Sequence, residues 1–550
     1  MSVDGLLARL AEAGMQLRRS GDQLVVTGEK QKLTPSLVAE IRDQKQALLS
    51  VVTSIGAESS APGFRLEPQM LPLVELNQEE IDGIVAGVPG GAANVQDVYP
   101  LAPLQEGMLF HHLISGDADP YLTPSLAAFD SRGRLEQYLA ALQAVIDRHD
   151  ILRTAIRWEG LREPVQVVWR RAELPVEEVQ LDEEGGDAAE QLWRRYDPRR
   201  YRMDLGRAPL LRACIAEDRA GGRWLLLMVM HHLVADHESQ EVLQGEIAAH
   251  LHGRARDLPP PLPFRNYVAQ ARLGVSREEH EAFFRELLGD VEEPTAPYGL
   301  LDVWGEERGV DEARLRVERG AGVRLRARAR ELGVSAASLC HLAWALVLAR
   351  LTGRQDVVFG TVLFGRMQGG EGSDRVMGPF INTLPVRIEV DAEAVEESVR
   401  RTHRLLAELL RHEHASLALA QRCSGVAAPA PLFTSLLNYR YGGSRGRSPE
   451  AGRSRQGMRG LRGQERSNYP VDLSVNDLGE EFSLAAQVAA PAEAMRVCRM
   501  MHTALERLVE ALEVSPGRAL GSIDVLPEEE RRQVVEEWNA TAAAYPRDAC

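Results

Sequence analysis

The chain has 550 residues, more than one hydrophobic core usually organises, so we expect a small unit followed by one large or two medium domains. Apolar residues make up 44% and charged residues 26%, which excludes a disordered or fibrous protein. The formal net charge of −16 repels a phosphate backbone and argues against nucleic-acid binding.

Targeting signals and cysteine usage predict a cytoplasmic location. The first seven residues lack the basic patch, apolar stretch and cleavage site of a secretory signal, and no apolar run reaches the roughly 18 residues of a membrane span. Five scattered cysteines without a CxxC pair favour reduced thiols over disulfides or a zinc site. No HExxH, P-loop or dinucleotide motif occurs, and we expect His412-Glu413-His414 on the surface rather than at a metal.

The first 52 residues have the pattern of a compact helix–hairpin–helix unit. Leucines at helical spacing predict a helix over 3–13, and short apolar runs at 15–19 and 23–27 flank a Ser-Gly-Asp turn. Thr34-Pro35 opens a second amphipathic helix that runs to residue 52. Residues 56–94 are rich in Ala, Gly, Pro and Ser, which predicts a linker, although 71–85 could form a short helix.

From residue 97 the chain follows a long α/β pattern. The run 224–230 is continuously apolar, which predicts a strand buried on both faces. His231, His232 and Asp236 follow it directly, so reactive side chains are expected at the end of a rigid central strand. The Arg-rich stretch 440–466 is interpreted as a solvated loop. Helical periodicity occurs at 134–148, 240–252, 279–288, 322–332, 337–351, 395–412 and 494–513.

Two adjacent histidines with an aspartate four residues after the second resemble the HHxxxD motif of condensation domains from nonribosomal peptide synthetases. Taken alone, the segment could also be a buried pair of core histidines. Further stretches resemble other motifs of that family and occur in the family order. These stretches are 99–109, 148–154, 359–366, 378–387 and 431–439.

The resemblance implies an α/β fold class, with two chloramphenicol-acetyltransferase-like lobes in a V-shaped pseudo-dimer around a tunnel. A small α-β-β-α docking domain would precede the lobes. The tail resembles the start of a linker to an adenylation domain, so we expect the natural protein to continue past Cys550. The expected ranges are 1–55 for the docking domain, 56–94 for the linker, 95–270 and 271–525 for the lobes and 526–550 for the tail.

The resemblance also implies a reaction, in which the amine of an acceptor aminoacyl thioester attacks a donor acyl or peptidyl thioester and a peptide bond forms. His232 would orient the amine and handle its proton, and His231 would support the turn. Asp236 would pair with Arg366 in a structural role. The chain itself would bind no cofactor or metal, because upstream and downstream carrier proteins supply the phosphopantetheine arms.

One subtype of the family has a second histidine motif, and His111-His112-Leu113 with Asp119 resembles it. That subtype both epimerizes the donor residue and condenses it, so His111 and His112 become epimerization candidates. Ala118 stands where the subtype has Gly, whereas His237 resembles the subtype at the position after Asp236. Alternatively, the two histidines merely complement a helix dipole in an ordinary condensation domain. A catalytically silent recruitment module is another alternative, and intact histidines argue against it and against heterocyclization.

The first 55 residues resemble a TubC-type docking domain. Such a domain adds the C-terminal tail of an upstream synthetase to its hairpin as a further strand. Arg18, Arg19, Lys30 and Lys32 would suit an acidic tail. The alternative is a solvated basic face without a partner.

Overall fold

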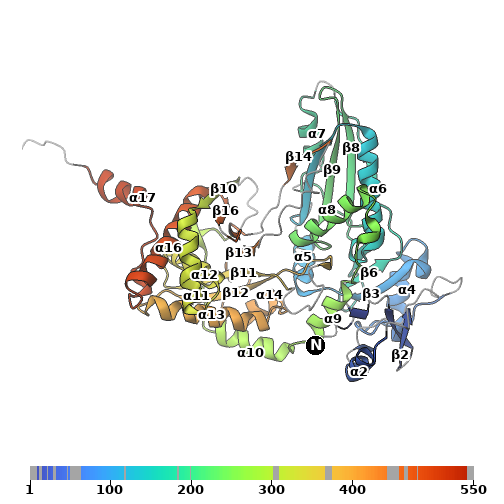
Figure 1. The fold of residues 1–550 in the computed structure, drawn as a ribbon, viewed down its shortest axis with the longest axis horizontal. Coiled ribbons are helices and arrows are strands. Elements are labelled where there is room, and N and C mark those ends of the chain that lie inside the picture. Colours follow the sequence, from blue (N-terminus) through green and yellow to red (C-terminus); the bar gives the residue numbers. More distant parts are fainter. Residues whose placement is uncertain are drawn as a thin grey trace, which may run out of the picture. The chain divides into compact units, whose positions relative to one another are not determined.

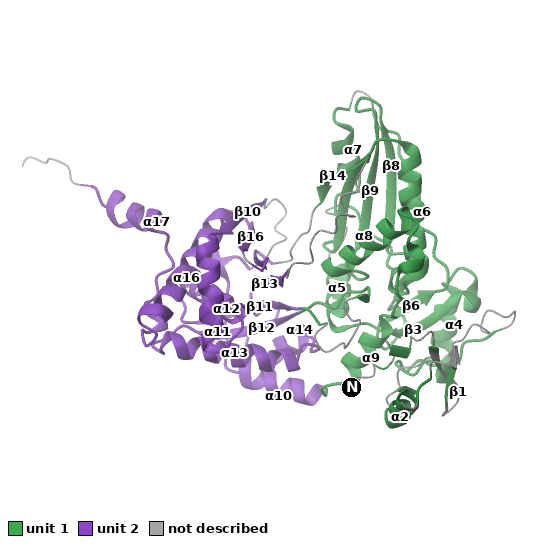
Figure 2. Ribbon diagram, in the orientation of Figure 1, with its two compact units in different colours: residues 1–276, 364–382, 446–466 green, residues 277–363, 383–445, 467–550 purple. Residues whose placement is uncertain are grey.

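The computed structural model divides into two compact units, coloured separately in Figure 2. It describes residues 64–541 apart from 115, 117–118, 183–184, 199, 302–308, 366–374, 443–456, 464–468 and 480, together with much of 6–49. Unit 1 comprises 1–276, 364–382 and 446–466, and unit 2 comprises 277–363, 383–445 and 467–550. A single boundary near residue 270 therefore does not describe the two units, because two later segments belong to unit 1.

The N-terminal hairpin of unit 1 consists of β1 (Met15–Ser20) and β2 (Gln23–Gly28), paired antiparallel with Met15 opposite Gly28. Both strands match the predicted ones to within a residue. Helix α2 (Pro35–Asp43) starts after Thr34, whose hydroxyl accepts the Leu37 N–H at 3.3 Å. Most of the helix predicted over 3–13 lies outside the described residues.

The segment predicted as a linker is part of the folded core of unit 1. Helix α4 (Gln78–Ala86) has a capping box between Asn77 and Glu80, and its Ile81 and Ile84 are buried. These residues pack in one apolar cluster with a three-stranded sheet. The linker prediction is wrong for 64–94, because buried aliphatic residues are spread among the Ala, Gly and Pro. The sheet has the order β3 (Val95–Pro100), β6 (Val165–Trp169), β5 (Thr154–Arg157).

The larger sheet of unit 1 contains the predicted buried strand at its centre (Figure 1). Its order is β14 (Met458–Gly463), β4 (Leu122–Phe129), β9 (Arg223–His231), β8 (Leu211–Asp218), β7 (Val176–Glu178). The helices of this unit include α5 (Pro103–Ile114), α6 (Arg132–Arg148), α7 (Ala188–Arg195), α8 (His237–Leu251) and α9 (Arg265–Leu273). Part of the stretch interpreted as a solvated loop thus forms β14, which pairs with β4 along one edge of the sheet.

Unit 2 is built on a mixed six-stranded sheet of order β10 (Val310–Val317), β16 (Phe482–Ala489), β15 (Val471–Asp477), β13 (Ser435–Tyr441), β11 (Asp356–Leu363), β12 (Asn382–Glu389). Its central helix α12 (Ala336–Thr352) is buried from Ser338 to Ala349. The other helices are α10 (Arg277–Leu288), α11 (Arg319–Leu332), α13 (Val395–Arg411), α14 (Leu417–Arg422), α16 (Ala494–Val514) and α17 (Glu528–Arg532). Both units therefore have α/β content.

Among the described residues, no single helix has the length and apolar character to cross a membrane. The pair α11 and α12 passes that test only when taken together, across a bend of 110°.

Candidate active site

The two histidines of the HHxxxD motif occupy different environments. Strand β9 ends at His231, whose side chain is fully buried, while the next residue, His232, is half-buried. Their backbones are held by the neighbouring chain, since the His231 N–H donates to the Leu210 carbonyl at 3.0 Å and the His232 N–H to the Tyr121 carbonyl at 2.9 Å. The end of a buried strand thus holds one histidine in the core and leaves the other partly accessible.

Hydrogen bonding fixes the tautomer of His231. Its Nδ1 accepts the backbone N–H of Leu233 at 3.0 Å, and its Nε2 lies 3.3 Å from Oδ1 of Asp119. A neutral imidazole has one N–H, so with Nδ1 accepting, the proton is on Nε2 and faces the carboxylate. Ligand atoms of His112, Asp119 and His231 lie within 4.8 Å of one another, but this tautomer has no lone pair on Nε2 for a metal ion. The contact with Leu233 is of the kind that a turn-supporting role requires.

Asp119 joins the two histidine motifs. It is fully buried, and its Oδ2 lies 3.2 Å from Nδ1 of His112 while its Oδ1 faces His231. Burial by itself raises the pKa of the Asp119 carboxyl, but the hydrogen bonds and charges of the two histidines outweigh burial and bring this pKa below its usual range. The carboxylate therefore stays ionised between the two imidazoles.

His111 and His112 are adjacent on α5 but face different surroundings. His112 is only 3% exposed and contacts Asp119, whereas His111 is half-buried, with its Nδ1 2.6 Å from the phenol oxygen of Tyr121. Burial lowers the pKa of the His111 imidazole, which favours its neutral form. Successive helical residues point about 100° apart, which explains why one histidine enters the buried cluster and its neighbour does not.

Asp236 fixes the loop that follows the motif. It caps α8, where its Oδ1 accepts the backbone N–H and the hydroxyl of Ser239 at 2.8 and 2.7 Å. Its Oδ2 accepts the backbone N–H of Phe380 at 3.1 Å. Ser239 also contacts the backbone of Gly378, where a side chain would collide with Phe264. The predicted partner Arg366 lies outside the described residues, so the pairing of Asp236 with Arg366 stays a prediction.

The remaining predicted site residues are spread over the chain. Arg18 and Arg19 lie in β1, but their side chains are outside the described part of the structure, as are Lys30 and Lys32. His237 starts α8 on an exposed position, 4.0 Å from Glu241. Sequence reasoning missed Tyr121 as a contact of His111 and Ser239 as a partner of Asp236. Only Ser239 had a local signal, because an N-cap residue often forms hydrogen bonds with a polar residue three positions later.

The expected surface position of His412-Glu413-His414 is wrong. His412 is 7% exposed and Glu413 is fully buried, and Nδ1 of His412 lies 2.8 Å from Nδ1 of His280 on α10. The ring of Phe283 stacks on His412, with the centroids 4.2 Å apart. The chain turns inward directly after α13, so the polar residues at its end meet the neighbouring helix instead of water.

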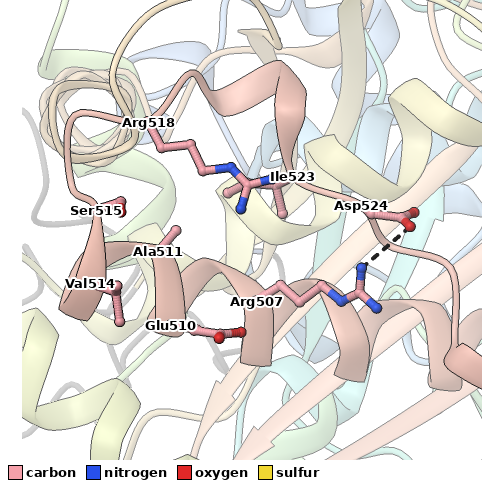
Figure 3. Close-up of a pocket in the computed structure, with 8 residues that line it drawn as sticks. All are labelled: Arg507, Glu510, Ala511, Val514, Ser515, Arg518, Ile523 and Asp524. Atoms are coloured by element: carbon pink, nitrogen blue, oxygen red, sulfur yellow. Dashed lines mark ion pairs between the residues drawn. The ribbon is translucent and has the colours of Figure 1, made fainter.

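A polar pocket of about 220 Å³ lies in unit 2, at the end of α16 (Figure 3). Its two arginines already have acceptors, since Arg507 pairs with Asp524 at 3.3 Å and Arg518 donates to Ser522 at 2.8 Å. The pocket contains none of the histidine-motif residues. It is lined by Arg507, Glu510, Ala511, Val514, Ser515, Arg518, Ile523 and Asp524.

Comparison with known proteins identifies relatives of this chain in sequence and in structure. The chain is 51% identical over 487 residues to malpinin synthetase of Mortierella alpina, covering 88% of the chain, and 46% identical over 535 residues to malpibaldin synthetase of the same organism, covering 97%. It spans only 6% and 10% of the lengths of these relatives. The solved EpoB cyclization–docking bidomain from Sorangium cellulosum covers 94% of this chain and all of its own, with a TM-score of 0.56 at 16% identity.

The sequence signature of the family described as "Condensation domain" matches residues 95–535. This range includes both histidine motifs, Asp119, and the segment around Phe380 that contacts Asp236. The chain therefore belongs to the condensation-domain family of nonribosomal peptide synthetases.

Proposed function

We propose that this chain forms a peptide bond between a donor acyl or peptidyl thioester and the amine of an acceptor aminoacyl thioester. Both substrates would be carried on phosphopantetheine arms of partner carrier proteins, and the chain itself would supply no cofactor. The observation that supports this best is the placement of His232, which is half-buried directly after the fully buried end of β9. An accessible imidazole on a rigid strand end suits a substrate that must be oriented.

The reaction requires removal of a proton from the acceptor amine. The amine nitrogen attacks the donor carbonyl carbon, the carbon–sulfur bond breaks, and the leaving thiolate takes up a proton. An α-amino group has a pKa of about 7.7–8.0, so most of it is protonated at pH 7, and an imidazole of pKa about 6.5 is suited to accept its proton. General-base catalysis contributes about 10²–10⁴-fold, whereas orientation can contribute about 7–11 kcal/mol. We assign both tasks to His232.

The test is direct. Loaded donor and acceptor carrier proteins are mixed with the chain, and the carrier-bound products are identified by mass spectrometry. A dipeptidyl thioester on the acceptor carrier supports the proposal. Loss of this product in His232→Ala supports the role of His232 in the reaction. An unchanged pair of substrates with the wild-type chain would favour a recruitment module instead.

We further propose that the chain epimerizes its donor residue before condensation. Asp119 supports this, because it connects His112 of the second histidine motif with His231 of the first. The two candidates differ, since His112 contacts the buried carboxylate while the half-buried His111 contacts a phenol. We therefore assign proton transfer to His111 and a structural role to His112. An L-donor without acceptor in heavy water should take up deuterium at its α-carbon, and an all-L product without uptake would indicate an ordinary condensation domain.

We also propose that the N-terminal unit binds the C-terminal tail of an upstream synthetase and that the C-terminal segment leads into an adenylation domain. The two-stranded sheet of β1 and β2 supports the first part, because each strand has an edge that can accept a further strand. The likeness to a cyclization–docking bidomain over 94% of this chain supports it as well. Calorimetry with the upstream tail should show binding to the full chain and none after deletion of residues 1–55.

A further inference from the structure

We propose that Tyr121 is a positioning residue that selects the base-competent tautomer of His111. This inference rests on the proposed epimerization and adds a residue that neither histidine motif contains. Tyr121 lies directly before β4, between Asp119 and the first strand residue, Leu122. It is therefore placed by the same chain segment that brings Asp119 to His231.

Tyr121 contacts both histidine motifs and the aspartate between them. Its phenol oxygen lies 2.6 Å from Nδ1 of His111, and the two rings are nearly parallel, with 6° between their planes. Its carbonyl accepts the backbone N–H of His232 at 2.9 Å. Its own N–H donates to Oδ1 of Asp119 at 3.4 Å. A single residue thus holds the side chain of the epimerization candidate and the backbone of the condensation candidate.

The direction of the hydrogen bond between the phenol and Nδ1 determines which nitrogen of His111 can act as a base. A neutral histidine with a lone pair on Nε2 carries its proton on Nδ1, and this N–H needs an acceptor. In the proposed arrangement the Tyr121 oxygen accepts this N–H, and the contact stabilises the tautomer that can remove a proton at Nε2. The same N–H···O contact persists when His111 becomes an imidazolium, so the proton transfer needs no rearrangement on that side. A phenol that donated its O–H to Nδ1 would instead place the histidine proton on Nε2, and Tyr121→Phe would then raise the exchange rate.

The proposed step balances without an oxidant or further reactant. The α-carbon–hydrogen bond of the donor breaks, its proton goes to Nε2 of His111, and its electron pair is delocalised into the thioester as an enolate. His232, in a form that has taken up a proton from water, would then return a proton to the opposite face of the α-carbon. Exchange of both imidazoles with water, His111 losing its proton and His232 gaining one, restores the starting state. The burial that lowers the pKa of His111 keeps this residue neutral at the start of the step.

The experiment compares Tyr121→Phe with wild type in the full chain, using donor-loaded carrier proteins. Exchange of the α-proton with heavy water is measured with an L-donor, and condensation is measured separately with a donor that already has the D configuration. The variant should lose at least about 10-fold in exchange relative to condensation, the range expected for one charge-assisted hydrogen bond. The acid limb of its exchange profile should also move to lower pH, because the imidazolium loses an acceptor.

A matched control is Tyr138→Phe, which removes another buried phenol, one that accepts from Gln244 Nε2 at 3.2 Å. This variant should retain the wild-type ratio of exchange to condensation. If wild type exchanges its donor proton and Tyr121→Phe does so at the same rate and with the same pH profile, the inference on Tyr121 is wrong while epimerization stands. If wild type shows no exchange at all, the proposed epimerization fails and the inference fails with it.

Discussion

Two sites with buried histidines, one in each unit of this chain, hold their imidazoles in different ways. In unit 1, His112 and His231 lie on either side of one buried carboxylate, Asp119. In unit 2, His341 donates from Nδ1 to the Ala337 carbonyl at 2.7 Å and accepts the Thr361 hydroxyl at Nε2 at 2.8 Å. The partners in unit 1 are charged, and these partners in unit 2 are neutral.

The difference shows two ways of holding a buried imidazole. Burial lowers the pKa of His341 to about 4, and burial together with the nearby His412 lowers that of His280 to about 4. Neutral partners orient these rings but do little to stabilise a positive charge. A carboxylate can both orient an imidazole and offset its positive charge. The charged contact in unit 1 thus anchors the residues next to His111 and His232, to which we assign proton transfer.

The largest expected effect comes from removing the shared carboxylate. Asp119→Ala leaves two buried imidazole groups without their acceptor and should destabilise unit 1 by about 3–5 kcal/mol. Urea denaturation followed by tryptophan fluorescence measures this loss. Asp119→Asn keeps the shape and one acceptor oxygen, so it should lose clearly less stability. Equal stability of Asp119→Ala and wild type would contradict the role of Asp119 in joining the two motifs.

The next effect is on catalysis. His232→Ala should lower the rate of peptide-bond formation at least about 10²-fold while the melting temperature stays near that of wild type. Single-turnover assays with loaded carriers measure the rate. The control is His252→Ala, at the exposed C-terminal end of α8, which should keep full activity. If His232→Ala is fully active, His232 is not the residue that accepts the amine proton.

A smaller effect should distinguish the two adjacent histidines of α5. His112→Ala removes a buried contact with a carboxylate and should cost about 2 kcal/mol, whereas His111→Ala should cost less than about 1 kcal/mol. Exchange of the donor α-proton should be lost in His111→Ala even though the protein remains folded. Thermal denaturation measures the stability of each variant, and deuterium uptake measures its exchange activity. Together they test whether His111 and His112 have separate roles. Equal instability in the two variants would argue against separate roles.

The sequence predicted the elements that have a strong local signal. The run 224–230 lies inside β9, and the periodic stretch 494–513 lies inside α16. It missed β14 because this strand is a short edge strand with exposed arginines and glycines, so no apolar alternation is present. It interpreted 64–94 as a linker because Ala, Gly, Pro and Ser are frequent there. The short helix that it allowed over 71–85 overlaps α4, whose Ile81 and Ile84 are buried.

The sequence identified several residues of the candidate site but not the contacts that Asp119 and Tyr121 make there. Motif spacing singled out His231, His232 and Asp236, and the structure places them at the end of a buried strand as expected. No local pattern encodes that Asp119 meets His231 or that Tyr121 meets His111. The first contact depends on how β4 pairs with β9, and the second on how the segment before β4 folds back onto α5. Tertiary pairing of distant segments supplies this information, which periodicity and propensity do not contain.

The last expected effect is a pH dependence that distinguishes the stability of unit 2 from that of unit 1. The pKa of His341 is about 4 in the folded state and about 6.5 when unfolded, so between these values the unfolded chain binds more protons. Stability is therefore fully present above pH 6.5 and falls as the pH drops toward 4, by up to about 1.4 kcal/mol per pH unit for one such group. Asp119 has a lowered pKa, so its contribution is lost only at lower pH, below about 4.

The measurement is the melting temperature of the full chain between pH 7.5 and 4.5, compared with His341→Leu. The variant removes one of three histidines of unit 2 whose pKa is lowered to about 4, so the decline between pH 6.5 and 4.5 should become shallower while His280 and His414 retain part of it, even if the stability at pH 7.5 is lower. Hydrogen exchange read by mass spectrometry, corrected for the intrinsic effect of pH, should show α12 losing protection in this interval before β9 and α5 do. Loss of protection in unit 1 first, or the same slope in wild type and His341→Leu, would contradict the contrast between charged and neutral partners.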